Sequence, residues 1–409
     1  MTENQPQSCP ATAAVRDALP FPFETSGLYE PPAEFATLRE ECPVAKVTMP
    51  TGDPAWLVTR YDDVRLALSD PRFSRAAASR DGAPRLRPLP PDRSTILAMD
   101  PPDHTRLRRL VSAVFKPRAI ERIRPFLTTM VDELLEGIKA QGPPADLVAS
   151  LALPLPVSAI GKLLGVPASD LGTFRGWADT MLTFTGGSAA DVQAARDAMN
   201  RYLAGLIAER RTALADDLIS GLITACDDDD RLTEREMIIF AATLLIAGYH
   251  TTSTAITAGT LMLLRHPGVF RALGTDPDLA TPVVDELLRY PAASSHGGNL
   301  RVVTEDVELG GVLIRAGEGV LPAIVSANRD ERVFDGAGEF RPGRAQTSLA
   351  FGHGPHYCLG AGLARMELEI VFPALSRHLP GLRLAAPESE LSYEPGALIR
   401  RLTTLPVTW

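Results

Sequence analysis

The sequence is poor in lysine and cysteine and has no strongly basic segment. Only four of its 41 basic residues are lysines, and the formal net charge is −9. Nucleic-acid-binding proteins usually carry a basic surface, so this composition argues against a nucleic-acid partner. None of the four cysteines forms a C-x-x-C pair or a disulfide framework. A reducing cytoplasm is therefore the expected location.

The sequence also lacks segments that would build other functions into the chain. Its first residues have neither the basic nor the apolar region of a secretion signal. It contains no G-x-G-x-x-G fingerprint and no four-cysteine cluster, so no flavin, nicotinamide or iron–sulfur module is expected within it. Any electrons must therefore come from a partner.

Helical periodicity dominates what is present. Residues 1–30 are polar and proline-rich and are predicted to be loosely ordered, residues 44–59 predict a hairpin, and the proline-rich stretch 84–102 predicts an irregular loop. Helices are expected at about 61–68, 103–115, 118–140, 146–165, 168–185, 190–214, 216–225, 233–265, 281–290 and 358–378, and strands at 299–303, 306–309 and 312–315. No repeat or linker separates two cores. The prediction is a mainly α fold with a minor β region, in a single domain over residues 31–409.

Residues 237–264 are almost free of charge and long enough to cross a membrane. A polar run, Tyr249 to Thr254, lies in their middle. This favours a buried helix in a large domain, and no membrane is expected.

The most informative segment is FGHGPHYCLG, residues 351–360. Its glycines and proline predict a tight loop that delivers Cys358 to the start of a helix running from Leu359. The partial positive charge of a helix N-terminus favours a thiolate, and thiolate ligation of haem iron favours cleavage of the O–O bond. The alternatives are a buried cysteine or a zinc site that includes His353 and His356, although no second Cys/His pair lies at zinc-finger spacing.

The pattern F-G-x-G-x-H-x-C-x-G resembles the haem-binding signature of the cytochrome P450 family, and other landmarks of that family follow in order across nearly the whole chain. The resemblance implies the cytochrome P450 fold and haem b (iron protoporphyrin IX), with Cys358 as the axial metal ligand and Phe351 beside the cofactor. It also implies a monooxygenase that inserts one atom of O₂ into an organic substrate, by hydroxylation or epoxidation.

Two further landmarks involve charged residues. ELLR (residues 286–289) matches the family's E-x-x-R motif, which implies a structural lock between Glu286, Arg289 and Arg344; alone, the motif is common by chance. DPPDHTRLR (residues 100–108) resembles the family's propionate-binding segment. His104 and Arg108 share a helix face, and guanidinium groups match carboxylates; the resemblance adds Arg301 and His356 as partners. The alternative is that the arginines at 106, 108 and 109 form a solvated face.

AGYHTT (residues 247–252) resembles the family's oxygen-activation motif. Leu244, Ala247, Gly248 and Thr251 share a helix face, where small residues leave room for a flat cofactor. We expect Thr251 to donate its hydroxyl to the Ala247 carbonyl. The resemblance implies that Thr251 steadies oxygen and its protonating water; the alternative is a satisfied core hydroxyl.

His250 departs from the family, which has a carboxylate here. Histidine can relay protons because its pKa lies near neutrality. Three interpretations stay open: His250 is a substitute catalytic relay, it points at the substrate or a neighbouring helix, or the relay is degraded and water and substrate groups act instead.

The remaining expectations concern substrate and partners. The resemblance places Leu97, Phe184, Leu244, Ala293, Ser294 and Ile399 in the substrate pocket. Small lining residues suggest a bulky lipophilic substrate, such as a macrolide, polyketide or terpenoid of secondary metabolism. Electrons from NAD(P)H are expected through a ferredoxin reductase and a ferredoxin that docks at Arg106, Arg109, Lys116 and Arg118. A monomer is expected. The alternative functions are a peroxide-driven peroxygenase and a non-catalytic haem-binding sensor or carrier.

Overall fold

The computed structural model describes residues 18–88, 91–112, 115–182, 188–224, 232–293, 298–394 and 399–409. By its contacts the chain divides into two compact units. Unit 1 comprises residues 1–93, 97–101 and 289–358, and unit 2 comprises residues 94–96, 102–288 and 359–409. A single domain over residues 31–409 stays a prediction.

Unit 1 is built on a six-stranded sheet. Its order is β1 (Leu19–Pro20), β2 (Val44–Thr48), β3 (Pro54–Val58), β9 (Gly319–Pro322), β6 (Arg301–Val303) and β4 (Phe73–Ser74), and a separate pair joins β7 (Val307–Leu309) to β8 (Val312–Ile314). The hairpin of β2 and β3 confirms the prediction, with Val44 opposite Val58, whereas β9 was not predicted. Within the segment expected to be loosely ordered, residues 18–30 carry β1 and the buried side chains of Phe21 and Tyr29.

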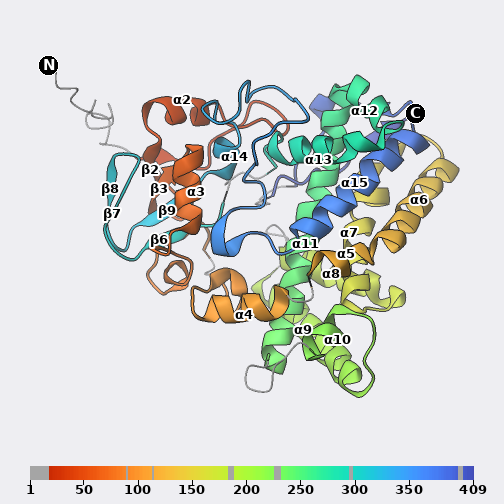
Figure 1. Cartoon of the computed structure of the whole chain (residues 1–409), viewed down its shortest axis with the longest axis horizontal. Helices are drawn as coiled ribbons and strands as arrows, with labels where there is room; N and C mark the ends of the chain where they lie inside the picture. The colour runs from red at the N-terminus through yellow and green to blue at the C-terminus, as the bar shows by residue number, and fades with distance from the viewer. Residues whose placement is uncertain are drawn as a thin grey trace. The chain divides into compact units, whose positions relative to one another are not determined.

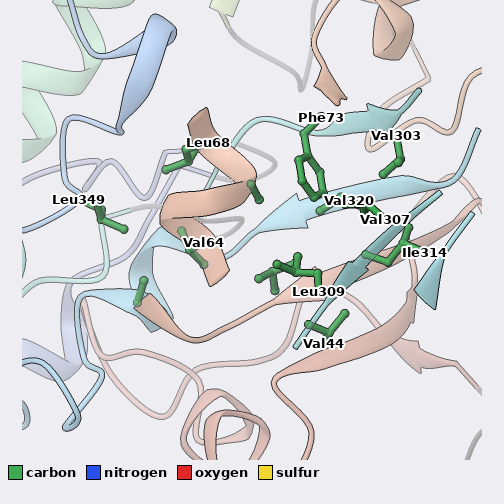
Figure 2. Close-up of a cluster of buried hydrophobic side chains, with 13 residues drawn as sticks. Val44, Val64, Leu68, Phe73, Val303, Val307, Leu309, Ile314, Val320 and Leu349 are labelled. Carbon is green, nitrogen blue, oxygen red and sulfur yellow. The ribbon is translucent and has the colours of Figure 1, made fainter. Parts of the chain in front are cut away.

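Helix α3 (Tyr61–Ser69) packs on one apolar core of unit 1. Figure 2 shows Val64 and Leu68 on this helix and Phe73 and Val320 on the strands beside it. The same core includes Leu349, which lies two residues before the cysteine loop. The C-terminal end of α3 and the start of that loop are therefore both anchored to one core. The other helices of unit 1 are α2 (Glu34–Glu41) and α14 (Ile324–Ala327).

Unit 2 is mainly helical and is organised around α11 (Glu234–Arg265; Figure 1). Thr233 and Glu236 begin this helix with a capping box. Helix α11 packs against α7 (Pro154–Leu164), α9 (Ala189–Thr212) and α15 (Ala361–His378). The other helices are α4 (Asp103–Ser112), α5 (Pro117–Glu121), α6 (Arg124–Gln141), α8 (Leu171–Leu182), α10 (Leu218–Thr224), α12 (Pro267–Leu273) and α13 (Ala280–Arg289, whose last residue belongs to unit 1), and a small sheet has the order β10 (Arg383–Leu384), β11 (Pro406–Thr408), β5 (Ala145–Asp146).

Helix α11 is long and apolar enough to cross a membrane by length and composition. Half of its most apolar window is buried inside the protein, and the core helix of a soluble protein passes the same test. The absence of a membrane partner stays a prediction.

The predicted fold class, mainly α with a minor β region, is confirmed. Three helix predictions were wrong in their bounds. The helix expected at 118–140 is two helices, α5 and α6, and the last helix begins at Ala361 instead of Leu359. The backbone N–H of Cys358 donates to the Phe351 carbonyl, so this residue closes the preceding loop and the helix starts later. The helix expected at 146–165 begins as α7 only at Pro154, after a π-helical turn, Val148–Ala152. Helix α12 was not predicted.

Candidate functional site

The loop of residues 351–358 presents Cys358 directly before α15. The Cys358 backbone nitrogen donates to the Phe351 carbonyl oxygen at 2.9 Å. Between these two residues the chain forms a short 3₁₀ turn, Gly354–His356. Gly352 and Gly354 have φ values of +73° and +71°, a region that other residues rarely adopt. Cys358 is exposed. The loop therefore presents a thiol two residues before Gly360, the N-cap of α15.

The same loop packs tightly on the C-terminal end of α3. A Cβ at Gly354 would lie 2.8 Å from Ser69 Cα and 2.9 Å from the Leu68 carbonyl oxygen, so only glycine fits. Arg65 Nε donates to His353 Nε2 at 3.2 Å, and burial together with the Arg65 charge lowers the pKa of His353. The described residues contain no cluster of three His, Cys, Asp or Glu side chains able to hold a metal. The zinc alternative therefore gains no support from this part of the chain.

Arg301 lies on β6, close to the same end of α3. Its Nη1 and Nη2 atoms make long contacts, 3.4 Å to the Phe73 carbonyl and 3.5 Å to the Leu68 carbonyl. Its buried Nε has no hydrogen-bond partner among the described residues. Burial, helped by the charge of Arg75 and opposed by Asp100, lowers the pKa of Arg301 to about 9. A buried guanidinium with such weak partners fits an anionic group such as a haem propionate.

Arg75 is a functional candidate that sequence reasoning missed. It is buried, and it donates to the carbonyls of Leu97 at 2.9 Å and of Leu300. Burial lowers its pKa to about 10 despite the charge of Asp100. Asp100 thus faces two buried guanidinium groups, those of Arg75 and Arg301. No local signal marks Arg75, because arginine is abundant throughout this sequence.

The arginine of the E-x-x-R motif is surrounded by backbone carbonyl groups. Glu286 and Arg289 are both buried on α13. Arg289 donates to the carbonyls of Asn328 (2.7 Å), Ala337 (3.0 Å) and Glu339 (3.0 Å). Arg344 donates to the Glu339 carbonyl as well, at 3.1 Å. Two guanidinium groups therefore brace the loop around Glu339.

In unit 2, α4 carries the two predicted propionate ligands. His104 is buried and Arg108 is half-buried, one helical turn apart. Arg106 forms an ion pair with Glu236 in the first turn of α11, whereas Arg109 is exposed. Of the three arginines in the solvated-face alternative, only Arg109 is exposed, whereas Arg106 and Arg108 are half-buried.

Helix α11 presents an accessible stripe although most of it is buried. Ala247 and Thr251 are exposed and Leu244 is partly buried, whereas residues 252–254 are buried. The Thr251 hydroxyl donates to the Ala247 carbonyl at 2.5 Å, as predicted. A Cβ at Gly248 would lie 2.5 Å from Ile160 Cδ1, so this glycine also lets α7 approach α11.

The His250 ring contacts a neighbouring helix and the C-terminal segment. Its Nε2 atom lies 3.1 Å from Asp179 Oδ1 on α8 and 3.1 Å from Arg401 Nη1. Asp179 and Arg401 are 71 and 151 residues from His250 in the sequence. Sequence reasoning missed both, because no local pattern joins such distant positions.

The predicted substrate-pocket residues are only partly described. In unit 1, Leu97 is 43% exposed and Ala293 is partly buried; in unit 2, Leu244 and Ile399 are partly buried. Phe184 and Ser294 lie outside the described residues.

Comparison with known proteins identifies the family. Residues 178–379 match the family model described as Cytochrome P450. Nocardicin C N-oxygenase of Nocardia uniformis subsp. tsuyamanensis is 44% identical over 400 residues, which covers 96% of this chain and 99% of the relative. Mycinamicin IV hydroxylase/epoxidase of Micromonospora griseorubida is 42% identical over 376 residues, 92% of this chain and 94% of that protein.

Solved structures agree with these relatives. The LnmA cytochrome P450 hydroxylase from the leinamycin biosynthetic pathway of Streptomyces atroolivaceus superposes with a TM-score of 0.90 at 44% identity, covering 96% of this chain and 100% of that one. A mutant of the mixed-function P450 MycG, in complex with mycinamicin IV, gives a TM-score of 0.91 at 40% identity, with coverage of 96% and 100%. The chain belongs to the cytochrome P450 family and is a haem-dependent monooxygenase.

Proposed function

We propose that the Cys358 thiolate would hold the haem iron of this monooxygenase. The observation that carries the proposal is a loop with a glycine that admits no side chain, which sets an exposed cysteine directly before a long helix. Partial positive charge at the start of such a helix favours the anionic form of the sulfur. When bound, haem supplies a thiolate-ligated iron for the activation of dioxygen.

We assign the haem propionates to Arg301 and His356 of unit 1 and to His104 and Arg108 of unit 2. Arg301 supports this most directly, because burial leaves it with weak hydrogen bonds and an unpartnered Nε among the described residues. Phe351, beside Cys358 in the loop, and Ala247, on the exposed stripe of α11, are assigned to the faces of the cofactor. Gly248 keeps its proposed place there in addition to its packing on α7.

Thr251 and His250 are the proposed proton-handling residues. The Thr251 hydroxyl donates its hydrogen bond to the Ala247 carbonyl, so its oxygen lone pairs stay available to accept a hydrogen bond from a water molecule. A water held there is oriented to deliver a proton. His250 takes the place of the family's carboxylate as the residue that exchanges protons.

The proposed substrate is a bulky lipophilic product of secondary metabolism, such as a macrolide, polyketide or terpenoid, and the reaction is a hydroxylation or epoxidation. The names of the relatives support this class, since they refer to nocardicin C and mycinamicin IV. Leu97, Leu244, Ala293 and Ile399 are the described candidates for contact with it.

Electrons are proposed to pass from NAD(P)H through a ferredoxin reductase and a ferredoxin. The exposed basic residues Arg109, Lys116 and Arg118 offer a docking surface on α4 and α5. A cytoplasmic location accords with the low cysteine content of the chain, and a monomer is proposed.

Two measurements test this function. The reduced protein with carbon monoxide should show a strongly red-shifted band of thiolate type, which Cys358→His should remove and the control Cys42→Ser should keep. Product formation from O₂ should require NADPH, ferredoxin and reductase. Turnover with hydrogen peroxide but none with NADPH, ferredoxin and reductase would favour a peroxygenase, and a thiolate band without turnover in either system would favour a sensor or carrier.

A further inference from the structure

One nitrogen of His250 lies within hydrogen-bond distance of both an acceptor and a donor. Its Nε2 atom lies 3.1 Å from the Asp179 carboxylate, which can only accept a hydrogen bond, and 3.1 Å from the Arg401 guanidinium, which can only donate one. Arg401 Nη1 and Asp179 Oδ1 are themselves 3.8 Å apart. The three groups therefore meet at a single atom.

Nε2 cannot satisfy both partners at once. With a proton it donates to Asp179, and without one its lone pair accepts from Arg401. Each protonation state therefore has its own hydrogen bond, and the ring need not turn when the proton arrives or leaves. This property suits an atom that exchanges protons repeatedly.

The charges around the ring are balanced when His250 is neutral. Asp179 of α8, which pairs with Arg175, and Arg401 of the C-terminal segment, which pairs with Glu394, contact the ring, and the Tyr249 ring of α11 lies beside it. Arg401 is held in place by Glu394, with its Nε 2.9 Å from Oε2. The formal charges of the two arginines and the two carboxylates cancel.

The cluster also reaches solvent. The Asp179 side chain is 34% exposed and the His250 side chain 10% exposed. Burial alone would raise the pKa of Asp179, but the hydrogen bond from His250 and the charges of Arg401 and Arg175 outweigh it and lower the pKa. Asp179 is therefore an anion that can pass solvent protons towards a buried ring.

We infer that His250 Nε2 is the proton-exchanging atom of this enzyme, with Asp179 as its proton partner from solvent and Arg401 as the donor that stabilises its deprotonated form. The carboxylate that residue 250 lacks is thus supplied by α8. The inference rests on the proposed function. Hydroxylation of a C–H bond by O₂ consumes two electrons and two protons and yields the product and one water. With hydrogen peroxide, the same product and one water form without a proton from solvent.

The proton position can be measured without turnover. Holoenzyme labelled with ¹⁵N-histidine, reduced and bound to carbon monoxide so that it is diamagnetic, has seven histidines, and the His250 signals are those lost in His250→Gln. We expect an Nε2 shift between the protonated and unprotonated limits. It should move towards the protonated limit in Arg401→Gln and towards the unprotonated limit in Asp179→Asn. An identical shift in all three proteins would overturn the inference.

Turnover separates a relay from a structural role. With 7-ethoxycoumarin as probe, hydroxylation beside the ether oxygen releases fluorescent 7-hydroxycoumarin and acetaldehyde. In Asp179→Asn we expect product per NADPH to fall at least tenfold, since a positioned acid–base group typically contributes on the order of 10²- to 10⁴-fold. The peroxide-driven rate should change less than twofold. Equal losses with both oxidants would contradict the relay.

Asp170→Asn is the matched control. It makes the same chemical change just before α8, where Asp170 accepts a hydrogen bond from Tyr202, and it should leave product per NADPH within twofold of the parent. Peroxide-driven product in the parent protein shows that the oxygenation site is intact. Failure of the relay can therefore be told apart from failure of the proposed function.

Discussion

Replacing Gly354 with alanine tests how the cysteine loop is held. The structure predicts two contributions to the loss of folding stability in this variant. Gly354 has φ +71°, and a left-handed conformation costs an L-residue about 1–2 kcal/mol. The new Cβ would also lie 2.8–2.9 Å from the backbone of Leu68 and Ser69, and such overpacking costs about 1–3 kcal/mol. The expected destabilisation by Gly354→Ala is therefore ~2–5 kcal/mol.

Gly352→Ala provides the matched control in the same loop. Gly352 has φ +73°, but a Cβ there would be 3.9 Å from the His356 carbonyl oxygen, an ordinary contact. Only the backbone cost of ~1–2 kcal/mol applies to this variant. The difference in unfolding free energy between the two variants therefore measures the contribution of the contact between the loop and α3.

Calorimetry of the holoprotein measures this difference. At about 2.1 cal/mol/K per residue, unfolding of 409 residues carries an entropy of roughly 0.9 kcal/mol/K, so 1 kcal/mol shifts the midpoint by about 1 °C. Gly354→Ala should melt ~1–3 °C below Gly352→Ala and should show a smaller thiolate-type band with carbon monoxide. Equal midpoints for the two variants would refute the argued contact with Leu68 and Ser69.

Three further substitutions test other parts of the structure. Arg301→Gln should speed transfer of haem to excess apomyoglobin by about 10- to 150-fold, since charge-assisted hydrogen bonds contribute on the order of 1.5–3 kcal/mol; the exposed control Arg315→Gln should not. Burial raises the pKa of Glu367 to about 8, so the native state binds a proton that the unfolded state releases above pH 4.5, and stability falls by roughly 1.4 kcal/mol per unit up to pH 8. In urea denaturation, the free energy of unfolding of Glu367→Gln should therefore rise relative to that of the parent between pH 5 and 8. A difference in unfolding free energy that stays constant with pH would contradict this. Arg344→Ala removes three hydrogen bonds to the carbonyls of Asp335, Gly336 and Glu339 and in the same assay should cost about 1–3 kcal/mol, more than Arg341→Ala, which removes two from an exposed side chain.

The accessible stripe on α11 is an example of a feature that can be predicted from sequence, because it depends only on spacing along one helix. Positions three and four residues apart share a face whatever surrounds them, so the grouping of Leu244, Ala247 and Thr251 followed from spacing alone. The bond from Thr251 to the Ala247 carbonyl is equally local. The second constraint on Gly248, its approach to Ile160, depends on which helix packs there.

The sequence by itself determined the features whose physics is local: the mainly helical fold, the tight loop that carries Cys358 and the helix face that carries Thr251. Tertiary structure decided the partners of buried charges. Arg75 lies beside Arg301 and Asp100, and Asp179 and Arg401 meet at His250, across 71 and 151 residues of chain. Periodicity and turn chemistry act over a few neighbouring residues, whereas a buried ion finds its counter-ion only when distant segments pack together.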